Sequence, residues 1–467
     1  MKTKAIPSQW LIKNGHRMDC NPYMGGAVEA RAILEKLACQ KQQLHELTIG
    51  IYHAGREGRK WVETEEFGVP FLGSTDILKS DLSHLPFISK QQVANNPAFT
   101  IHKGWTLITR SGTIGRMAYA RPDMDGMACS EHVMRVVPDT NEIPSGYLYA
   151  YLNSKFGVPI VVSGTYGSII QSIEPQHIAA LPVPRLGDTI EGAIHRLVEE
   201  AAELRVEYQT KLNEATSTLF EAAGLKDIEA EDWHAQGADL GYSVKLPSPR
   251  SLRALNFNSR YLGFVEKLKR IKHKKLSDIC SGGQLSSGVR FKRIDASPEF
   301  GGMLIGQKQG FFANPQGRWI SVEHSPDGIF VGDETVLIAS QGTLGEHEVF
   351  CRPIFITGEW LNYVYSQHFL RVVSGDPDIS GAYLFAFIRS EMVFRCLRSM
   401  SIGSKQQDIH TGMLGDLPIP IISDHLISKI EELVRDAFVA KDSANESESK
   451  AIGLVEQAIE QAAQVKH

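Results

Sequence analysis

The sequence has few cysteines, and they lie far apart. Its six cysteines, in 467 residues, come no closer than the 19 positions between Cys20 and Cys39, and no CxxC or Cys/His pair with zinc-ligand spacing occurs. A disulfide framework and a structural zinc site are therefore not expected. The sequence also lacks the apolar core of a signal peptide after Met1, and it has no apolar run of about 18 residues, the minimum for a membrane-spanning helix. These absences lead us to expect a reduced, cytoplasmic protein.

The chain also lacks an excess of positive charge. Its formal net charge is −5 with a pI near 6.4, and contents of 42% hydrophobic and 22% charged residues are ordinary for a globular protein. The whole-chain charge thus gives no sign of nucleic acid, although a positive surface on one face is compatible with an acidic remainder. At this length, one hydrophobic core is too little, and we expect more than one domain.

Motifs for catalysis are missing as well. The glycine turns described below are not followed by Gly-Lys-Ser/Thr, so they are not Walker loops. The segments Asn21-Pro-Tyr23 and Asn96-Pro-Ala-Phe99 lack the second proline of an amino-methyltransferase motif and an upstream glycine fingerprint. Two equal domains also do not suit base flipping, which needs one deep pocket, and no carboxylate cluster suits a nuclease metal. We expect a non-catalytic chain; a DNA methyltransferase is the enzyme alternative.

What the sequence does contain is a long internal repeat. Residues 130–184 return as residues 366–420, 236 positions later and without a gap. Ser130-Glu-His-Val-Met-Arg-Val-Val137 returns as Ser366-Gln-His-Phe-Leu-Arg-Val-Val373, and Leu181-Pro-Val-Pro184 returns as Leu417-Pro-Ile-Pro420. A repeat of this length at a single offset indicates two homologous domains in tandem.

Each copy follows an apolar run that ends in a Gly-rich turn, Gly112-Thr-Ile-Gly115 in the first and Gly342-Thr-Leu-Gly345 in the second. Glycine-bounded apolar runs predict strands at 69–72 and 303–305 and within 316–349, whereas the run from Tyr147 predicts a helix. Two further helices are expected at 26–39 and 261–271. Each repeat is therefore predicted to be α+β, with a mostly antiparallel or mixed sheet.

A long helix is predicted after each Leu-Pro-x-Pro segment. From Ile190 to Tyr208 the apolar positions alternate in steps of four and three, which is the seam of a coiled coil, and Gly224 ends the pattern. The second helix runs from Ile427 to Ala462, and its polar middle, 441–450, is expected to be hydrated, bent or frayed. Because each seam needs a partner, we expect the two helices to pair as an antiparallel coiled coil.

This arrangement resembles the specificity (S) subunit of type I restriction–modification enzymes. The resemblance covers essentially the whole chain and lies in the duplicated order of the Gly-Thr-x-Gly turns, the Leu-Pro-x-Pro segments and the spacer helices. One departure is that many members open the helix with a Glu-Gln pair, where this chain has Arg185-Leu-Gly-Asp-Thr-Ile190 and Ile421-Ile-Ser-Asp-His-Leu426. The departure bears on which modification partner is bound and on whether the system is standard type I or a related one.

The resemblance implies a target-recognition domain at 1–185, a central spacer helix at 186–224, a second target-recognition domain at 225–421 and a C-terminal spacer helix at 422–467. Each domain would read one half of a bipartite, asymmetric site in double-stranded DNA, with half-sites about 34–36 Å or a multiple apart. The helices would dock two DNA methyltransferase subunits. S-adenosylmethionine, and any ATP, Mg or restriction and translocase activity, would belong to partner subunits.

Candidate DNA contacts are basic or polar residues in and beside the Gly turns and at matching places in the two repeats, together with two lysines of the densest positive run, 267–275, at the base of the second repeat. They are Arg56, Arg59, Lys60, Arg110, Thr113, Tyr166 and Ser168 in the first repeat, and Lys272, Lys274, Arg290, Lys292, Arg293, Thr343, Ser404, Lys405 and Gln406 in the second. Basic side chains suit phosphates and guanine, glutamine suits adenine, and the N–H groups of a glycine turn suit a phosphate. Solvated loops, and turns in which only glycine fits, explain the same residues.

Two histidines, His132 and His368, occupy the same place in the repeats. No carboxylate or cysteine lies at catalytic spacing from them, so we expect packed core or helix-capping histidines. For the whole chain, a repeat-based scaffold of another defence system, binding DNA or protein, remains the alternative to a restriction–modification subunit. A salt-dependent affinity for DNA would distinguish DNA binding from protein binding.

Overall fold

The computed structural model of the chain describes residues 3–13, 16, 18, 20–163, 172–236 and 251–464. The chain divides into two compact units: unit 1 comprises Met1–Val206 and Ser443–His467, and unit 2 comprises Glu207–Asp442. Two long helices, α8 (Asp188–Ala222) and α15 (Asp424–Gln464), each contribute one part to unit 1 and the other part to unit 2. Each unit is therefore an α+β domain together with half of each long helix.

Unit 1 is built on two four-stranded sheets. The first has the order β2-β9-β6-β7 and is antiparallel throughout, and the second has the order β3-β5-β4-β8, in which β4 and β8 are parallel. The strands are β1 (Lys41–Gln43), β2 (Thr48–Tyr52), β3 (Trp61–Val62), β4 (Gly68–Leu72), β5 (Phe87–Ser89), β6 (Thr106–Thr109), β7 (Met117–Tyr119), β8 (Ala128–Cys129), β9 (Val133–Pro138) and β10 (Pro182–Pro184). The helices are α1 (Ser8–Lys13), α2 (Asn21–Met24), α3 (Ala27–Glu35), α4 (Lys90–Asn95), α5 (Ser145–Leu152), α6 (Gly157–Ser163) and α7 (Pro175–Ala179).

Unit 2 repeats this plan, and its described residues also form a three-stranded sheet of the order β16-β21-β20; in unit 1 the pairing of β16 with β21 has its counterpart in a bridge between Ser111 and Ser172. An antiparallel sheet has the order β12-β19-β15-β17, and a second sheet has the order β14-β13-β18, in which β13 and β18 are parallel. The strands are β11 (His273–Lys275), β12 (Gln284–Ser287), β13 (Gly301–Ile305), β14 (Arg318–Ser321), β15 (Thr335–Ala339), β16 (Gln341–Gly342), β17 (Pro353–Ile356), β18 (Val364–Tyr365), β19 (Phe369–Val373), β20 (Ser401–Gly403), β21 (Gln407–Ile409) and β22 (Pro418–Pro420). The helices are α9 (Ala230–Ala235), α10 (Ser259–Lys269), α11 (Leu276–Ile279), α12 (Gly381–Ile388), α13 (Glu391–Ser399) and α14 (Thr411–Gly415).

The central sheet of unit 2 is buried on both faces, as the alternation of side chains along β15 shows. Val336 and Ile338 belong to the apolar cluster that contains α12, whereas Leu337 and Ala339 belong to the cluster on the opposite face. Strand β15 is therefore apolar on both sides, with α12 against one face of the sheet and β13, β18 and the segment around Trp360 against the other.

The repeated segments occupy the same places in the two units. Each Leu-Pro-x-Pro segment forms a short strand that pairs antiparallel with the segment before the first sheet, Gln42 with Val183 in unit 1 and Lys274 with Ile419 in unit 2. The repeated Arg-Val-Val motif lies in β9 and β19, and the predicted helix from Tyr147 is α5. The predicted fold class is thus confirmed, with an α+β fold written twice and a long helix after each copy.

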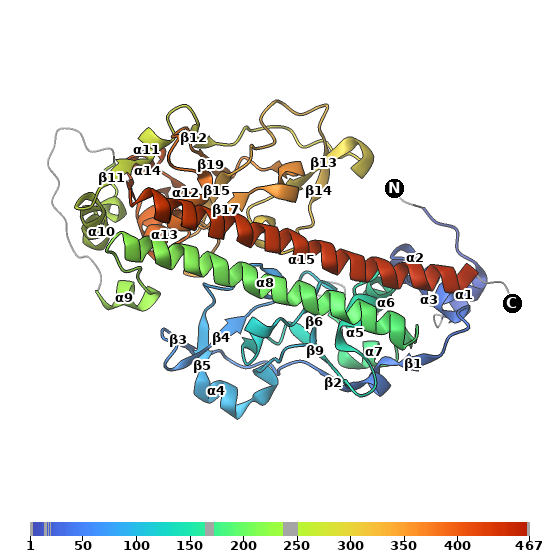
Figure 1. Ribbon diagram of the computed structural model, residues 1–467. Helices are drawn as coiled ribbons and strands as arrows, with labels where there is room; N and C mark the ends of the chain where they lie inside the picture. The colour runs from blue at the N-terminus through green and yellow to red at the C-terminus, as the bar shows by residue number, and fades with distance from the viewer. Residues whose placement is uncertain are drawn as a thin grey trace. The chain divides into compact units, whose positions relative to one another are not determined.

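The two long helices pair antiparallel, as predicted. In unit 2, Lys211 of α8 contacts Asp436 of α15 (2.8 Å) and Glu214 contacts Lys429 (3.3 Å), so residue numbers rise on one helix and fall on the other (Figure 1). In unit 1, residues of α8 and α15 share the apolar core of the α+β domain; they are Ile194, Val198, Ala202, Ala451, Val455 and Ile459. Each half of each long helix therefore packs on the α+β domain of its own unit.

The prediction for the polar middle of the second helix was wrong. Residues 441–450 are helical throughout, and Lys441, Ala444 and Glu448 are buried rather than hydrated. The polar side chains at these positions are enclosed by an ion pair in one unit and by aromatic rings in the other, which the residue types alone did not reveal. Among the described residues, no helix is long and apolar enough to cross a lipid bilayer.

Candidate nucleic-acid interface

In unit 1, the loop between β2 and β3 carries three of the predicted contacts. Arg56 and Lys60 are exposed, and within the described part of the chain neither side chain has a hydrogen-bond or ion-pair partner. Arg59 is used internally, because its Nη2 lies 2.9 Å from Oε2 of Glu131 and its guanidinium stands 4.9 Å from the ring centre of Phe71. Arg56 and Lys60 are therefore available to a phosphate, whereas Arg59 fixes the loop that carries them.

Arg110 is buried, contrary to what a DNA contact requires. Only 9% of the residue is exposed; Nε donates to the carbonyl of Ile173 (3.0 Å), Nη1 donates to the carbonyl of Glu131 (3.3 Å), and Nη2 pairs with Glu174. The Glu174 carboxylate also lies 3.4 Å from Nε2 of His53. Arg110 thus ties the start of the glycine turn to the segment before α7, and its side chain is not presented to a ligand.

The first Gly turn (112–115) needs its glycines for steric reasons. Gly112 and Gly115 have φ values of +77° and +80°, and a Cβ built on Gly115 would collide with Cγ2 of Val162 on α6. Thr113 is exposed at the tip of the turn, and its carbonyl accepts a hydrogen bond from Oγ1 of Thr109. The predicted contacts Tyr166 and Ser168 lie outside the described residues.

In unit 2, the loop after β12 presents the predicted basic cluster. Arg290, Lys292 and Arg293 are exposed, and their side chains have no hydrogen-bond or ion-pair partner among residues 251–464 and the other described segments. Phe291, between them, packs against the apolar cluster below. This inward anchor holds the three cations on the surface, where desolvation does not oppose contact with a phosphate.

The predicted basic residues at the base of unit 2 differ from one another. Lys272 is exposed, whereas Nζ of Lys274 forms an ion pair with Oδ2 of Asp376 (2.6 Å). Both lie at or beside β11, which pairs with β22, and this pair is a different sheet from the one that holds the second Gly turn. The structure does not bring them together with the other candidates.

The second Gly turn (342–345) and the polar loop 404–406 are brought together. Strand β16 pairs with β21, and β21 pairs with β20, so Gln341 and Gly342 lie directly beside the hairpin whose loop is 404–406. Thr343, Ser404, Lys405 and Gln406 are all exposed. Two segments that are 60 residues apart in the sequence thereby form one polar surface.

At the centre of this surface, Gln341 connects three other polar side chains. Its backbone N–H donates to Oε1 of Gln307 (3.0 Å), and its backbone carbonyl accepts from Nε2 of Gln307 (2.7 Å). Its own amide donates from Nε2 to Oδ2 of Asp408 (3.3 Å), while Oε1 contacts Nδ1 of His368. We call these four half-buried residues, Gln307, Gln341, His368 and Asp408, the amide cluster.

Arg293 joins the amide cluster through its charge. Burial lowers the pKa of the His368 imidazole, and the neighbouring guanidinium of Arg293 lowers it further, while the Asp408 carboxylate opposes both. His368 is therefore neutral at pH 7. The basic loop starts beside this histidine, because the N–H of Gly288 donates to the carbonyl of Phe369 (3.1 Å), and β16 with the Gly turn pairs with β21 of the hairpin, so the three predicted sets of unit 2 border the amide cluster.

The equivalent place in unit 1 has the same geometry and different chemistry. Ser111, which precedes Gly112 as Gln341 precedes Gly342, has its Oγ 2.6 Å from Nδ1 of His132. Nε2 of His132 lies 3.3 Å from Oε1 of Glu131, which is also the partner of Arg59. We call Arg59, Ser111, Glu131 and His132 the charged cluster.

Sequence reasoning undervalued these histidines. Both are half-buried and bind the residue before a glycine turn, so they are neither core residues nor helix caps. Gln307 and Asp408 were missed altogether. The available signal was that the repeated histidine and the polar residue before the turn occur in both copies, but nothing in the sequence showed that they touch.

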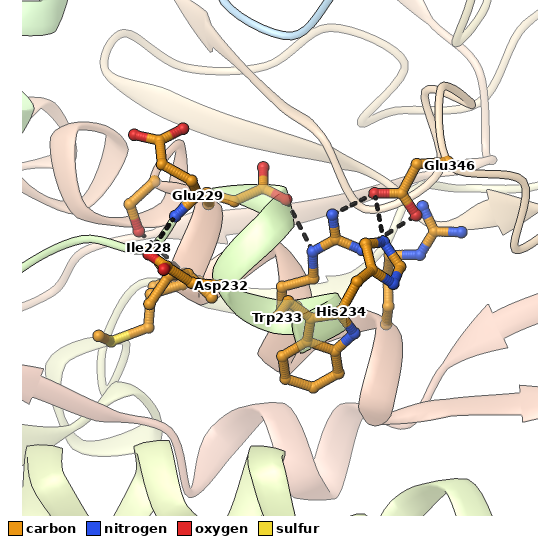
Figure 2. Close-up of polar contacts among 12 residues, drawn as sticks. Ile228, Glu229, Asp232, Trp233, His234 and Glu346 are labelled. Atoms are coloured by element: carbon orange, nitrogen blue, oxygen red, sulfur yellow. Dashed lines mark hydrogen bonds and ion pairs between the residues drawn. The ribbon is translucent and has the colours of Figure 1, made fainter. Parts of the chain in front are cut away.

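An ionic contact anchors the second Gly turn to the domain (Figure 2). The guanidinium of Arg398 donates to the carbonyl of Gly345 (3.0 and 3.1 Å), and Arg395 forms an ion pair with Glu346. His234 on α9 lies 3.6 Å from the same carboxylate and faces it in Figure 2. Burial opposes ionisation of Glu346, but the hydrogen bond and charge of Arg395, with His234 and Arg398, hold its pKa at about 2.

The helix that carries His234 is itself fixed to unit 2. Trp233 stacks on Phe264 of α10, with ring centres 5.8 Å apart, and the guanidinium of Arg260 lies 4.3 Å from the Trp233 ring centre. The turn is thus held from behind by the side chains of Arg395, Arg398 and His234. Among the described residues, no group of three or more His, Cys, Asp or Glu side chains is arranged to hold a metal ion.

Comparison with known proteins gives similarity to solved structures alone. No protein-family model and no curated protein matches the chain. The type I restriction–modification S subunit from M. genitalium is 13% identical, with a TM-score of 0.37 over 91% of this chain and 96% of that one. The HsdS subunit from Thermoanaerobacter tengcongensis is 12% identical, with a TM-score of 0.28 over 90% and 96%.

A third structure, from work on complex assembly and conformational transition of the type I R-M system, is 12% identical, with a TM-score of 0.26 over 91% and 97% of the two chains.

Proposed function

We propose that this chain is the DNA-recognition subunit of a type I-like restriction–modification complex. Each unit reads one half of a bipartite, asymmetric site in double-stranded DNA. The chain itself is non-catalytic and works in the cytoplasm. S-adenosylmethionine, and any ATP and Mg, are bound by partner subunits, which include two DNA methyltransferase subunits and any restriction or translocase subunit.

One observation carries the proposal. The two units share their frame, including sheet order, Leu-Pro-x-Pro strand and glycine turn, but differ in the side chains gathered at the turn. Unit 1 has the charged cluster, and unit 2 has the amide cluster. A shared frame with different polar groups is what two readers of different half-sites require, because base edges are distinguished by their donor and acceptor patterns.

The exposed cations beside the clusters support contact with a duplex. Arg56 and Lys60 in unit 1, and Arg290, Lys292 and Arg293 in unit 2, carry charge that no described residue neutralises. Such side chains give local affinity for phosphates although the chain as a whole is acidic. A protein-binding scaffold does not need them at both sites.

The test is a map of DNA methylation in cells that carry this gene and its neighbouring methyltransferase gene, compared with cells that lack only this gene. We expect a gapped, asymmetric methylated motif that disappears without the chain. Exchange of residues 1–185 for another recognition domain should change one half of that motif and leave the other half intact. An unchanged methylome would contradict the proposal and leave a DNA- or protein-binding repeat protein of another system.

A further inference from the structure

The amide cluster fixes which nitrogen of His368 carries the proton. A carboxylate cannot donate, so Asp408 must accept from the amide nitrogen of Gln341, and this contact orients the amide. The opposite end of the amide, Oε1, therefore faces Nδ1 of His368. Because an amide oxygen only accepts, Nδ1 must be the protonated nitrogen.

In a neutral imidazole, the second nitrogen is then a bare acceptor. No described residue supplies a hydrogen bond or an ion pair to Nε2 of His368. The side chain is half-buried at the polar surface formed by the second Gly turn, the hairpin loop 404–406 and the basic loop 290–293. Unit 2 thus presents an oriented acceptor, with its second nitrogen unused, at a surface that also carries the donor-only cations Arg290, Lys292 and Arg293.

The equivalent histidine in unit 1 has the opposite arrangement. Nε2 of His132 faces the Glu131 carboxylate at 3.3 Å, so Nε2 carries the proton and its hydrogen-bonding capacity is used. Nδ1 is the acceptor, and Oγ of Ser111 lies 2.6 Å from it and donates. The repeat therefore places one residue type at two equivalent positions in opposite tautomers, and only the second has an unused acceptor.

On the basis of the proposed function, we propose that Nε2 of His368 accepts a hydrogen bond from the exocyclic amino group of one base in the half-site read by unit 2. In the major groove such an amino group is presented by adenine (N6) and by cytosine (N4), whereas guanine and thymine present acceptors there. His368 is then a specificity-determining residue, and Gln341 and Asp408 are positioning residues that hold its tautomer.

Acid should abolish this recognition. Protonation of Nε2 converts the acceptor into a donor and adds a positive charge beside Arg293. The charged groups that face the imidazole are Arg293, from the loop after β12, and Asp408, from β21. The recognition is therefore present at neutral pH, where the imidazole is uncharged, and is lost on acidification.

The experiment uses the full chain, with its modification partners where binding requires them, and duplexes that contain the methylated motif. Each adenine and cytosine of the second half-site is replaced, one at a time, by an analogue that lacks only the exocyclic amino group. Dissociation constants are measured for the unaltered protein, for His368→Ala and for the matched control His132→Ala.

We expect one analogue position to weaken binding of the unaltered protein by about 2- to 12-fold, the value of a single hydrogen bond. At that position the penalty should vanish in His368→Ala and persist in His132→Ala. Whether that position holds an adenine or a cytosine tells which base donates to His368. Persistence of every penalty in His368→Ala, with DNA binding otherwise intact, would overturn the inference.

Two further arms keep the test decisive. If His368→Ala fails to fold, the unaltered protein is measured against the intact and the analogue duplex from about pH 8 to about pH 5.5, the range in which a histidine titrates. The discrimination should disappear at low pH, and a constant ratio would contradict the inference. If the unaltered chain shows no salt-dependent affinity for any duplex, it is the proposed function that fails.

Discussion

Arg205 of α8 and Glu448 of α15 form an ion pair inside unit 1, with Nη2 and Oε2 2.6 Å apart and side chains that are 9% and 7% exposed. The hydroxyl of Tyr149 donates to the other oxygen of Glu448, and Nη2 of Arg205 also donates to Asn445 (3.3 Å). The pair joins both long helices to the helix α5 of the domain body. Its geometry is satisfied only in one register of the two helices.

We expect Glu448→Leu to lower the free energy of unfolding by about 3–5 kcal/mol, because it leaves the Arg205 guanidinium buried without a counter-charge. The double variant Arg205→Leu/Glu448→Leu should recover most of that loss. Asp436→Ala, which removes the exposed partner of Lys211, is the control and should cost less than about 1 kcal/mol. Urea denaturation measures all three, and equal losses in the single and double variants would contradict the assignment.

Lys441 lies 236 residues after Arg205, at the equivalent position of the repeat, but it has no equivalent partner. Leu212 stands where the repeat would place a counterpart of Glu448, and Nζ lies over the rings of Trp360 (3.7 Å), Phe438 (5.3 Å) and Tyr208 (5.8 Å) instead. Burial lowers the pKa of Lys441 to about 7, against the charge of Asp442, which raises it.

An unfolded lysine titrates near 10.4, so between about pH 7 and pH 10.4 unfolding takes up a proton. Stability should therefore rise with pH across this window, by at most about 1.4 kcal/mol per pH unit. We expect Lys441→Met to remove the slope and to be the more stable protein at pH 7. The difference between the two proteins in urea midpoints at several pH values isolates this lysine, and parallel profiles would refute the prediction.

The Glu346 carboxylate predicts acid sensitivity of unit 2. Its pKa of about 2 lies below the value of about 4.3 for an unfolded glutamate, so its contribution is complete above about pH 4.3 and is lost as the pH falls toward 2. Because a third of the side chain is exposed, we expect a contribution of only about 1–2 kcal/mol. Glu346→Gln should flatten this part of the stability profile, as followed by circular dichroism, and should leave the profile above pH 5 unchanged in slope.

Two glycine substitutions should have opposite effects. Gly115→Ala places a Cβ at positive φ and against Val162, and we expect a loss of about 1–3 kcal/mol. Gly263→Ala lies in the interior of α10 with open space around the added Cβ, and it should raise the free energy of unfolding by about 0.8–1 kcal/mol. Thermal unfolding monitors both variants, and a neutral Gly115→Ala would mean that the turn relaxes without cost.

Salt dependence should separate the exposed cations from the paired ones. Each of Arg290→Ala and Lys292→Ala should reduce the slope of log K against log salt by about 0.9, the value of one phosphate contact on duplex DNA. Lys269→Ala, whose ammonium already pairs with Glu266 on the same helix, should leave the slope unchanged. Fluorescence anisotropy with a labelled duplex gives the slopes. Equal slopes in all three variants would move the DNA-binding surface away from this loop.

The internal repeat made the fold predictable, because it fixed the order of elements twice over. Strands β4 and β13, helix α5 and both long helices fall where the pattern indicated, and α12 is the counterpart of α5 in the second repeat. The polar middle of α15 could not be predicted, because the burial of Lys441 and Glu448 depends on rings and charges contributed by other elements. A polar residue can be expected on the surface only when the fold offers no ring or opposite charge against which its side chain can be buried.

The candidate site was predictable only as separate segments. The exposed cations at 290–293 and the polar loop at 404–406 were found because basic or polar residues occur at matching places in the two repeats. Arg110 was misjudged because the sequence does not distinguish an arginine that faces solvent from one that is buried against Glu174. The convergence on His368 depends on the pairing of β16 with β21, a contact between segments distant in sequence that no local pattern encodes.

Because the long helices are divided between the units, the two units complete their folding in a defined order during synthesis. Unit 2 is one continuous stretch, Glu207–Asp442, and all of its core is available once that stretch has emerged. Unit 1, although its first 206 residues are made earlier, needs Ala451, Val455 and Ile459 to close its core. Unit 1 is therefore translated first but completes its fold last. Until α15 emerges, the apolar residues of unit 1 that this helix covers stay exposed, although unit 2 can already fold.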